Sequence, residues 1–247
     1  MHRGGKPRAH GFLYNESLAP MTPKPPAPLD WQRLRLFIFD LDGTLIDSKL
    51  DLALAVNATR ARFGLGPLPH EQVFGYIGDG APMLVRRALD HTAADALVEQ
   101  ALAFFLPYYR AHMLDNTVAY PGVREALAAL DAGGRVLTVL TNKPARISRE
   151  ILAGLGLVSH FKLIYGGNSF ERKKPDPMGV KAILRETGAT KGESLVVGDS
   201  EIDVQTARNA GVRVCGVTYG LGSDRLRDHS PDRLFDNLTE LAALVSG

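Results

Sequence analysis

Short apolar runs alternate with helical patterns along most of the chain. The runs lie at residues 34–39, 136–140, 163–165, 195–197 and 212–217. Brief apolar stretches bounded by turn residues are typical of buried parallel strands. Apolar residues spaced as in an amphipathic helix separate them, and predict helices at about 123–130, 144–153, 178–186 and 201–210. This alternation predicts an α/β fold with an open, doubly wound parallel sheet.

Residues 49–119 interrupt the alternation. Apolar positions recur there at helical spacing, including Leu97, Ala101, Phe104, Phe105 and Tyr108, and strand signals are lacking. We therefore predict a small α-helical cap domain inserted after the first strand. The α/β core would comprise residues 31–48 and 120–247, the cap 49–119, and a flexible tail 1–30.

The expected tail has a composition of its own. It holds six of the fifteen prolines and no clear periodicity, which is typical of a segment without a packed core. Met21 lies ten residues before Trp31, where the folded part is expected to begin. We hypothesise that translation starts at Met21, which mass spectrometry of the native N-terminus would test.

Composition and charge narrow the possible partners. A hydrophobic content of 45% and a charged content of 23% are those of a soluble globular protein. No apolar run approaches the roughly 20 residues that span a bilayer, so no membrane partner is expected. The formal charge of +2 equals that of residues 1–30 alone, so the remainder is neutral and offers no footprint for nucleic acid. The single cysteine, Cys215, lies in a strand-like run and predicts a buried thiol in a reducing cytoplasm.

Candidate chemistry gathers where the predicted strands end. Asp40 ends one strand, Thr141 follows another, Asp199 a third, and Lys174 lies in the loop after a fourth. The ligand crevice of a parallel α/β sheet lies beyond these carboxyl ends. Asp42 is two residues from Asp40, a spacing that puts both side chains on one face of an extended chain. The pattern predicts that acids, a hydroxyl and an amine converge on one rim.

The motifs around these residues stand in a recognisable order. They are Asp40-Leu41-Asp42-Gly43-Thr44, Leu140-Thr141-Asn142-Lys143-Pro144, Lys174-Pro175-Asp176-Pro177 and Val197-Gly198-Asp199-Ser200-Glu201-Ile202-Asp203. With them the chain resembles the haloacid dehalogenase superfamily phosphatases, and within these the bacterial phosphoglycolate phosphatases. The likeness extends from about residue 34 to residue 247, and residues 1–30 have no counterpart in it.

The resemblance implies a Mg²⁺-dependent reaction through a phospho-aspartate. Asp40 would be the nucleophile and a metal ligand, and Asp199 a second metal ligand. Asp42 would give the metal its backbone carbonyl, while its side chain acts as general acid and then general base. Dehalogenase and phosphonatase relatives lack an acid at this position, which argues against those activities.

The same resemblance assigns the residues around the phosphate. Thr141 and the adjoining backbone at Asn142 would hold phosphate oxygens, and Lys174 would neutralise their charge. Asp203 would order a metal-bound water, although it also suits the first turn of a helix, where the dipole favours an acid. Ser48 is expected to cap the first helix of the insert.

The insert offers candidates for reading the substrate. Gly78, Asp79 and Gly80 precede an apolar helix and suit either a helix-entry turn or a loop that closes over the phosphate. Arg86, together with its neighbour Arg87, could meet a substrate carboxylate or simply belong to a surface helix face.

The substrate itself stays open among several small phosphorylated metabolites. We expect 2-phosphoglycolate first, with pyrophosphate, sugar phosphates and N-acetylmuramic acid 6-phosphate as alternatives. A phosphomutase of β-phosphoglucomutase type would use the same four motifs. A receiver-like phospho-switch is a non-enzymatic alternative, but a receiver lacks both the cap and Asp-x-Asp-Gly-Thr. The protein is expected to act as a monomer or a homodimer.

Overall fold

Six parallel strands form the main sheet, in the order β5-β4-β1-β6-β7-β8. A computed structural model describes residues 1–2, 29–90 and 92–246. The strands are β1 (Leu36–Phe39), β4 (Val136–Leu140), β5 (Phe161–Tyr165), β6 (Ser194–Gly198), β7 (Arg213–Val217) and β8 (Arg233–Phe235). All neighbouring pairs are parallel, with β1 hydrogen-bonded between β4 and β6. The predicted doubly wound α/β fold is confirmed.

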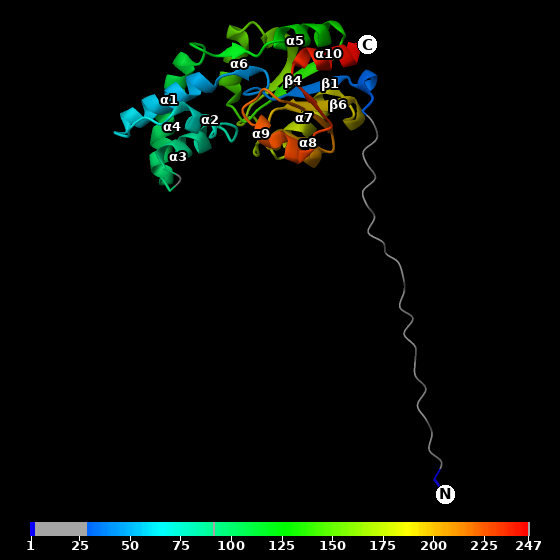
Figure 1. Ribbon diagram of the computed structural model, residues 1–247, viewed down its shortest axis with the longest axis horizontal. Coiled ribbons are helices and arrows are strands. Elements are labelled where there is room, and N and C mark those ends of the chain that lie inside the picture. Colours follow the sequence, from blue (N-terminus) through cyan, green and yellow to red (C-terminus); the bar gives the residue numbers. More distant parts are fainter. Residues whose placement is uncertain (3–28, 91, 247) are drawn as a thin grey trace.

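Helices cover both faces of this sheet (Figure 1). The helices are α5 (Val123–Ala132), α6 (Ala145–Gly154), α7 (Met178–Thr187), α8 (Glu201–Ala210), α9 (Ser223–Leu226) and α10 (Leu238–Ser246), with 3₁₀ turns at Trp31–Arg33, Val158–His160, Lys191–Glu193 and Arg227–His229. Because successive strand side chains point to opposite faces, Phe37 and Phe39 pack in one core with α5, α6 and α10. Leu36 and Ile38 pack in the other with α7 and α8.

The insert is helical, as expected, and lies at one end of the molecule (Figure 1). It contains α1 (Lys49–Arg62), α2 (His70–Phe74), α3 (Ala81–Leu89) and α4 (Asp95–His112). Where the chain enters and leaves it, β2 (Ile46–Asp47) pairs antiparallel with β3 (Val118–Ala119). The buried Asp51 carboxylate accepts hydrogen bonds from both Asn116 and Thr117, which ties the start of α1 to the returning segment. The exact domain boundaries stay a prediction.

The buried stripe of α4 differs from the one expected. The structure buries Val98, Ala101, Phe105 and Tyr109, while Leu97 is 38% exposed. Phe104 and Tyr108 stack on each other. The helical period was therefore right, but the buried face is shifted, and Tyr109 rather than Tyr108 reaches the interior.

Strand β8 and helix α10 were not predicted, although α10 packs on α5 and completes one face of the sheet. Cys215 is buried and free, as expected. The predicted tail, Met21 included, falls almost wholly on residues outside those described. No helix in the described part of the chain has the length and apolar character needed to cross a membrane.

Candidate active site

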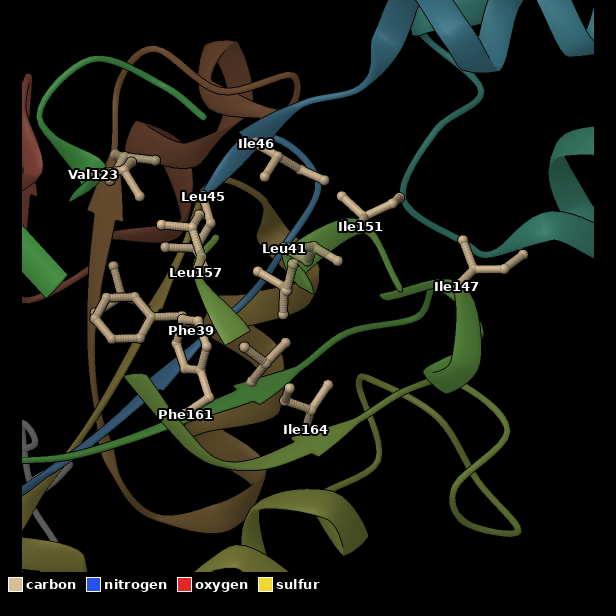
Figure 2. Close-up of a cluster of buried hydrophobic side chains, with 14 of the residues drawn as sticks. Phe39, Leu41, Leu45, Ile46, Val123, Ile147, Ile151, Leu157, Phe161 and Ile164 are labelled. Carbon is tan, nitrogen blue, oxygen red and sulfur yellow. The ribbon is translucent and has the colours of Figure 1, made fainter. Parts of the chain in front are cut away.

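The loop after β1 points its two acids away from the core. Leu41 is fully buried among apolar residues that include Ile151 and Phe161 (Figure 2). Asp40 and Asp42, on either side of it, line a cavity on the opposite side of the loop. The two-residue spacing therefore orients both carboxylates as the sequence predicted.

This cavity lies where the α/β core meets the helical insert. Its core wall includes Thr141, Asn142 and Asp199, and its other wall comes from α1, α3, α4 and the loop before α3. About 70 Å³ of it is open to a water-sized molecule. The space suits a small ligand held against the acids that end the strands.

Three carboxylates lie together at the base of the site. Asp40, Asp199 and Asp203 each bring an oxygen within 4.8 Å of the others. Lys174 Nζ lies 2.9 Å from Asp40 Oδ1 and 2.6 Å from Asp203 Oδ1. One ammonium therefore contacts two of these three acids, and Asp199 and Asp203 are buried. Hard carboxylate oxygens are the ligands of Mg²⁺ and similar cations, so this donor set fits a divalent metal.

The electrostatics of the acids support that fit. Burial, reinforced by Asp203 and Asp40, raises the pKa of Asp199 to about 8. Burial also raises the pKa of Asp40 to about 6, although Lys174 opposes the shift. Burial acts against the charge on Lys174, but Asp203 and Asp40 outweigh it and raise the pKa of that ammonium. A bound cation would supply the positive charge that ionised Asp40 and Asp199 lack.

These shifts predict how stability depends on pH in the metal-free protein. Because the pKa of Asp199 is about 8 in the folded state and 3.8 ordinarily, the folded state binds more protons between those values. The free energy of unfolding should therefore fall as pH rises from about 5 to 8 in EDTA. Saturating Mg²⁺ should remove or reverse the fall, because metal binding favours the ionised acids. Thermal unfolding at several pH values measures this, and equal slopes with and without metal would contradict it.

Asp199 is held in place by backbone that comes very close to it. Thr44 Oγ1 donates to its Oδ1 at 3.3 Å, and the Gly222 N–H to its Oδ2 at 2.9 Å. A Cβ on Gly43 would lie 2.2 Å from Asp199 Oδ2. Gly43 also has a φ of +84°, so both the turn and this contact require glycine.

Gly43→Ala is expected to impair the site more than the fold. The matched control is Gly64→Ala, at a φ of +71° with no atom within 4 Å of an added Cβ. Both substitutions strain the backbone by about 1–2 kcal/mol. Only Gly43→Ala should displace Asp199 and lower Mg²⁺ affinity and kcat/KM about 10- to 100-fold. Equal activity losses in the two variants would show that the Asp199 contact does not matter.

Asp42 has partners that the sequence analysis did not single out. Lys143 Nζ lies 2.9 Å from Asp42 Oδ1 and 3.2 Å from Oδ2, and also donates to Tyr109 Oη on α4 at 2.8 Å. Ser48 Oγ donates to Asp42 Oδ1 at 2.5 Å. The expectation that Ser48 is the N-cap of α1 is confirmed as to position. Its hydroxyl, however, makes no capping bond.

The other predicted residues of the core have more than one contact. Thr141 is buried on the cavity wall and accepts a hydrogen bond from the Lys143 N–H. Asn142 donates its side-chain amide to the carbonyls of Gly78 and Lys174, and so fastens the loop before α3 to the core. Asp203 accepts from the N–H and hydroxyl of Ser200, in a capping box at the start of α8. It thus has the predicted helix-start role and is also a neighbour of the acid cluster.

The predicted residues of the insert divide into two groups. Gly78 and Gly80 line the cavity. Asp79 instead forms an ion pair with Arg87 at 2.5 Å, and its carbonyl accepts a hydrogen bond from Lys173. Arg86 pairs with Asp95 and donates to the Ala93 carbonyl at 2.7 Å. The structure does not bring the side chains of Asp79 or Arg86 to the cavity, because other groups of the insert hold them.

Comparison with known proteins places this site in a family. Residues 37–217 match the haloacid dehalogenase-like hydrolases. The chain is 44% identical over 213 residues to a phosphoglycolate phosphatase of Pseudomonas putida, an alignment that covers 84% of this chain and 78% of that protein. A phosphoglycolate phosphatase of Chromobacterium violaceum is 40% identical over 218 residues, covering 84% and 98%.

Solved structures agree with the sequence comparison. The crystal structure of a predicted phosphoglycolate phosphatase from Haemophilus somnus superposes with a TM-score of 0.82 at 32% identity, covering 86% of this chain and 98% of that one. The chain belongs to the haloacid dehalogenase-like hydrolase family. The resemblance inferred from the four motifs is confirmed.

Proposed function

We propose that the protein is a magnesium-dependent phosphatase that hydrolyses a small phosphate monoester, with 2-phosphoglycolate as the first choice. One observation carries the proposal. The cavity that is lined by Asp40 and Asp42 is also lined by Thr141 and Asp199. Lys174 forms an ion pair with Asp40 at the base of the site. A nucleophile, an acid–base group, a hydroxyl and a charge-neutralising amine are the parts that phosphoryl transfer through an aspartate requires.

In the first half of the reaction, an oxygen of the Asp40 carboxylate attacks phosphorus. The bond from phosphorus to the ester oxygen breaks, and Asp42 gives its proton to that leaving oxygen. The alcohol departs and the phosphoryl group remains on Asp40. Thr141 and Lys174 would stabilise charge on the phosphoryl oxygens during the transfer.

In the second half, water attacks the phosphorus of phospho-Asp40. Asp42 takes the proton from that water, and the bond from phosphorus to the Asp40 oxygen breaks. Inorganic phosphate leaves, and both acids return to their starting forms. Asp40, Asp199 and the Asp42 carbonyl would hold Mg²⁺, and Asp203 would order a water on it. When bound, the ion would lower the repulsion between the carboxylate nucleophile and an anionic phosphate.

The choice of 2-phosphoglycolate rests on the relatives together with the cavity. Proteins named phosphoglycolate phosphatase are 40–44% identical to this chain. The described cavity is also small, and its wall from the insert is mostly apolar. A sugar phosphate would need partners for several hydroxyl groups, which such a wall does not provide.

A panel of phosphate esters compared by kcat/KM tests the substrate, because discrimination lies in that ratio. We expect 2-phosphoglycolate to be hydrolysed most efficiently, and EDTA to abolish turnover. Conversion of β-glucose 1-phosphate into glucose 6-phosphate without phosphate release would favour the phosphomutase instead. A higher kcat/KM for pyrophosphate or a sugar phosphate would agree with the phosphatase mechanism but would assign a different substrate.

A further inference from the structure

Lys143 places a buried ammonium on the cavity wall beside the reacting acids. Its side chain is 4% exposed. It lines the same cavity as Asp40, and among the described residues of that wall it is the one with a basic side chain. Lys174, the other lysine of the site, is held by Asp40 and Asp203 at the base. Lys143 is therefore the cation on the side from which the rest of a substrate would project.

The wall from the helical insert gives no competing positive charge. Its side chains are apolar, as with Leu52, Leu84 and Phe105, except for the hydroxyl of Tyr109. Arg86 and Arg87, which could have met a carboxylate, are paired with Asp95 and Asp79. Lys143 is also paired, with Asp42, but unlike the two arginines it lines the cavity, and so it is the cation there that an anionic group of a substrate can meet.

Tyr109 adds a second donor to that position. Its hydroxyl accepts a hydrogen bond from Lys143 Nζ at 2.8 Å, which leaves the hydroxyl's own proton free to donate. Among the described residues, none accepts a hydrogen bond from this hydroxyl, and Tyr109 is only 2% exposed. Buried tyrosine hydroxyls usually find a partner. An ammonium and a hydroxyl in contact can both donate to one carboxylate.

We infer that Lys143 and Tyr109 bind the carboxylate of the substrate's leaving group. They would so select phosphorylated short hydroxy acids over phosphate esters whose leaving group is uncharged. This inference rests on the proposed function. Burying a carboxylate without a partner is costly, and this pair offsets that cost. Asp42 and the packing of α4 hold the two side chains in place before the substrate binds. Little side-chain conformational entropy is therefore lost on binding.

The pair also explains how both walls take part in selection. Lys143 follows β4 in the core, whereas Tyr109 belongs to α4 of the insert. A carboxylate bound by both would join the two walls across the cavity. A neutral group of equal size would make neither contact as strongly, because hydrogen bonds to charged groups are the stronger ones.

The test compares two esters of nearly equal shape, 2-phosphoglycolate and its neutral amide, 2-(phosphonooxy)acetamide. The measured quantity is the ratio of their kcat/KM values in the wild type and in three variants. Lys143→Met should lower the ratio about 100-fold or more. Tyr109→Phe, which keeps the ring and removes the donor, should lower it about tenfold. Arg86→Met should leave the ratio unchanged, and thermal unfolding checks that each variant folds.

Each result decides a different point. If Lys143→Met slows both esters equally, Lys143 only positions Asp42, and the inference is overturned. A wild type that prefers the amide, or does not distinguish the two esters, also overturns it while leaving the phosphatase mechanism intact. Hydrolysis of neither ester, while other phosphate esters of the panel are hydrolysed, would overturn 2-phosphoglycolate as the substrate and this inference with it; hydrolysis of no phosphate ester at all would overturn the proposed function.

Discussion

Asp40→Asn is expected to lower kcat by about 10⁴-fold or more, because it removes the oxygen that forms the bond to phosphorus. The protein should remain folded. Burial and Asp203 already raise the pKa of Asp40, so an uncharged asparagine relieves repulsion within the acid cluster. Steady-state kinetics with 2-phosphoglycolate and thermal unfolding in EDTA measure the two effects.

Asp47→Asn is the matched control for this substitution. Asp47 belongs to the same segment after β1, but its carboxylate pairs with Lys49 at 2.9 Å and does not line the cavity. Its activity should stay within a few-fold of the wild type. Substantial activity of Asp40→Asn would mean that another group attacks the phosphate, and the mechanism would fail.

Lys174→Met should damage both activity and stability in the metal-free protein. Lys174 is 4% exposed and its ammonium contacts Asp40 and Asp203. Removing one partner of a buried charge pair costs about 3–5 kcal/mol, and loss of its charge at the phosphate should lower kcat/KM about 10²- to 10³-fold. Saturating Mg²⁺ should restore part of the stability, because the metal compensates the same acids.

Lys173→Met, at the neighbouring position, is the control. Lys173 contacts the carbonyl of Asp79 in the insert and is exposed. Its loss should cost well under 1 kcal/mol, as is usual for exposed charged groups. Kinetics and denaturation curves of the two variants give the comparison. If both lysine variants lost activity alike, Lys174 would have no special role at the phosphate.

The sequence predicted the structure best where the residues next to a position left only one arrangement of the chain. Leu41, between Asp40 and Asp42, has to enter the core, and this turns both acids toward the cavity. The five predicted strands appeared within a few residues of their expected bounds because apolar runs between turns leave little choice. Strand β8 was not predicted because its three residues include Arg233, which interrupts the apolar run. Strands β2 and β3 were not predicted because they have only two residues each, too few to show a period.

The missed part of the site depends on contacts between distant segments. Lys143 belongs to the motif that contains Thr141 and Asn142. The sequence around it, however, does not show that its side chain contacts Asp42. Tyr109 lies four residues after Phe105, a spacing that could have marked it as buried. Only the packing of α4 on the core brings its hydroxyl to Lys143. Likewise, Arg86 looked suited to a carboxylate until the fold paired it with Asp95.

The most direct test of the central claim is to identify the phosphorylated residue. The Asp42→Asn variant lacks the general base of the second step, and p-nitrophenyl phosphate spares the first step because its leaving group departs without a proton. Mixing this variant with p-nitrophenyl phosphate and Mg²⁺ should therefore accumulate the aspartyl phosphate. Borohydride converts an aspartyl phosphate to homoserine. Trypsin should release residues 36–49 as one peptide, since it cleaves after Arg35 and after Lys49. Mass spectrometry should find homoserine at position 40, and only when both substrate and metal are present. Homoserine at position 47 or 199, or none while p-nitrophenol is released in a burst, would contradict a phospho-Asp40 intermediate.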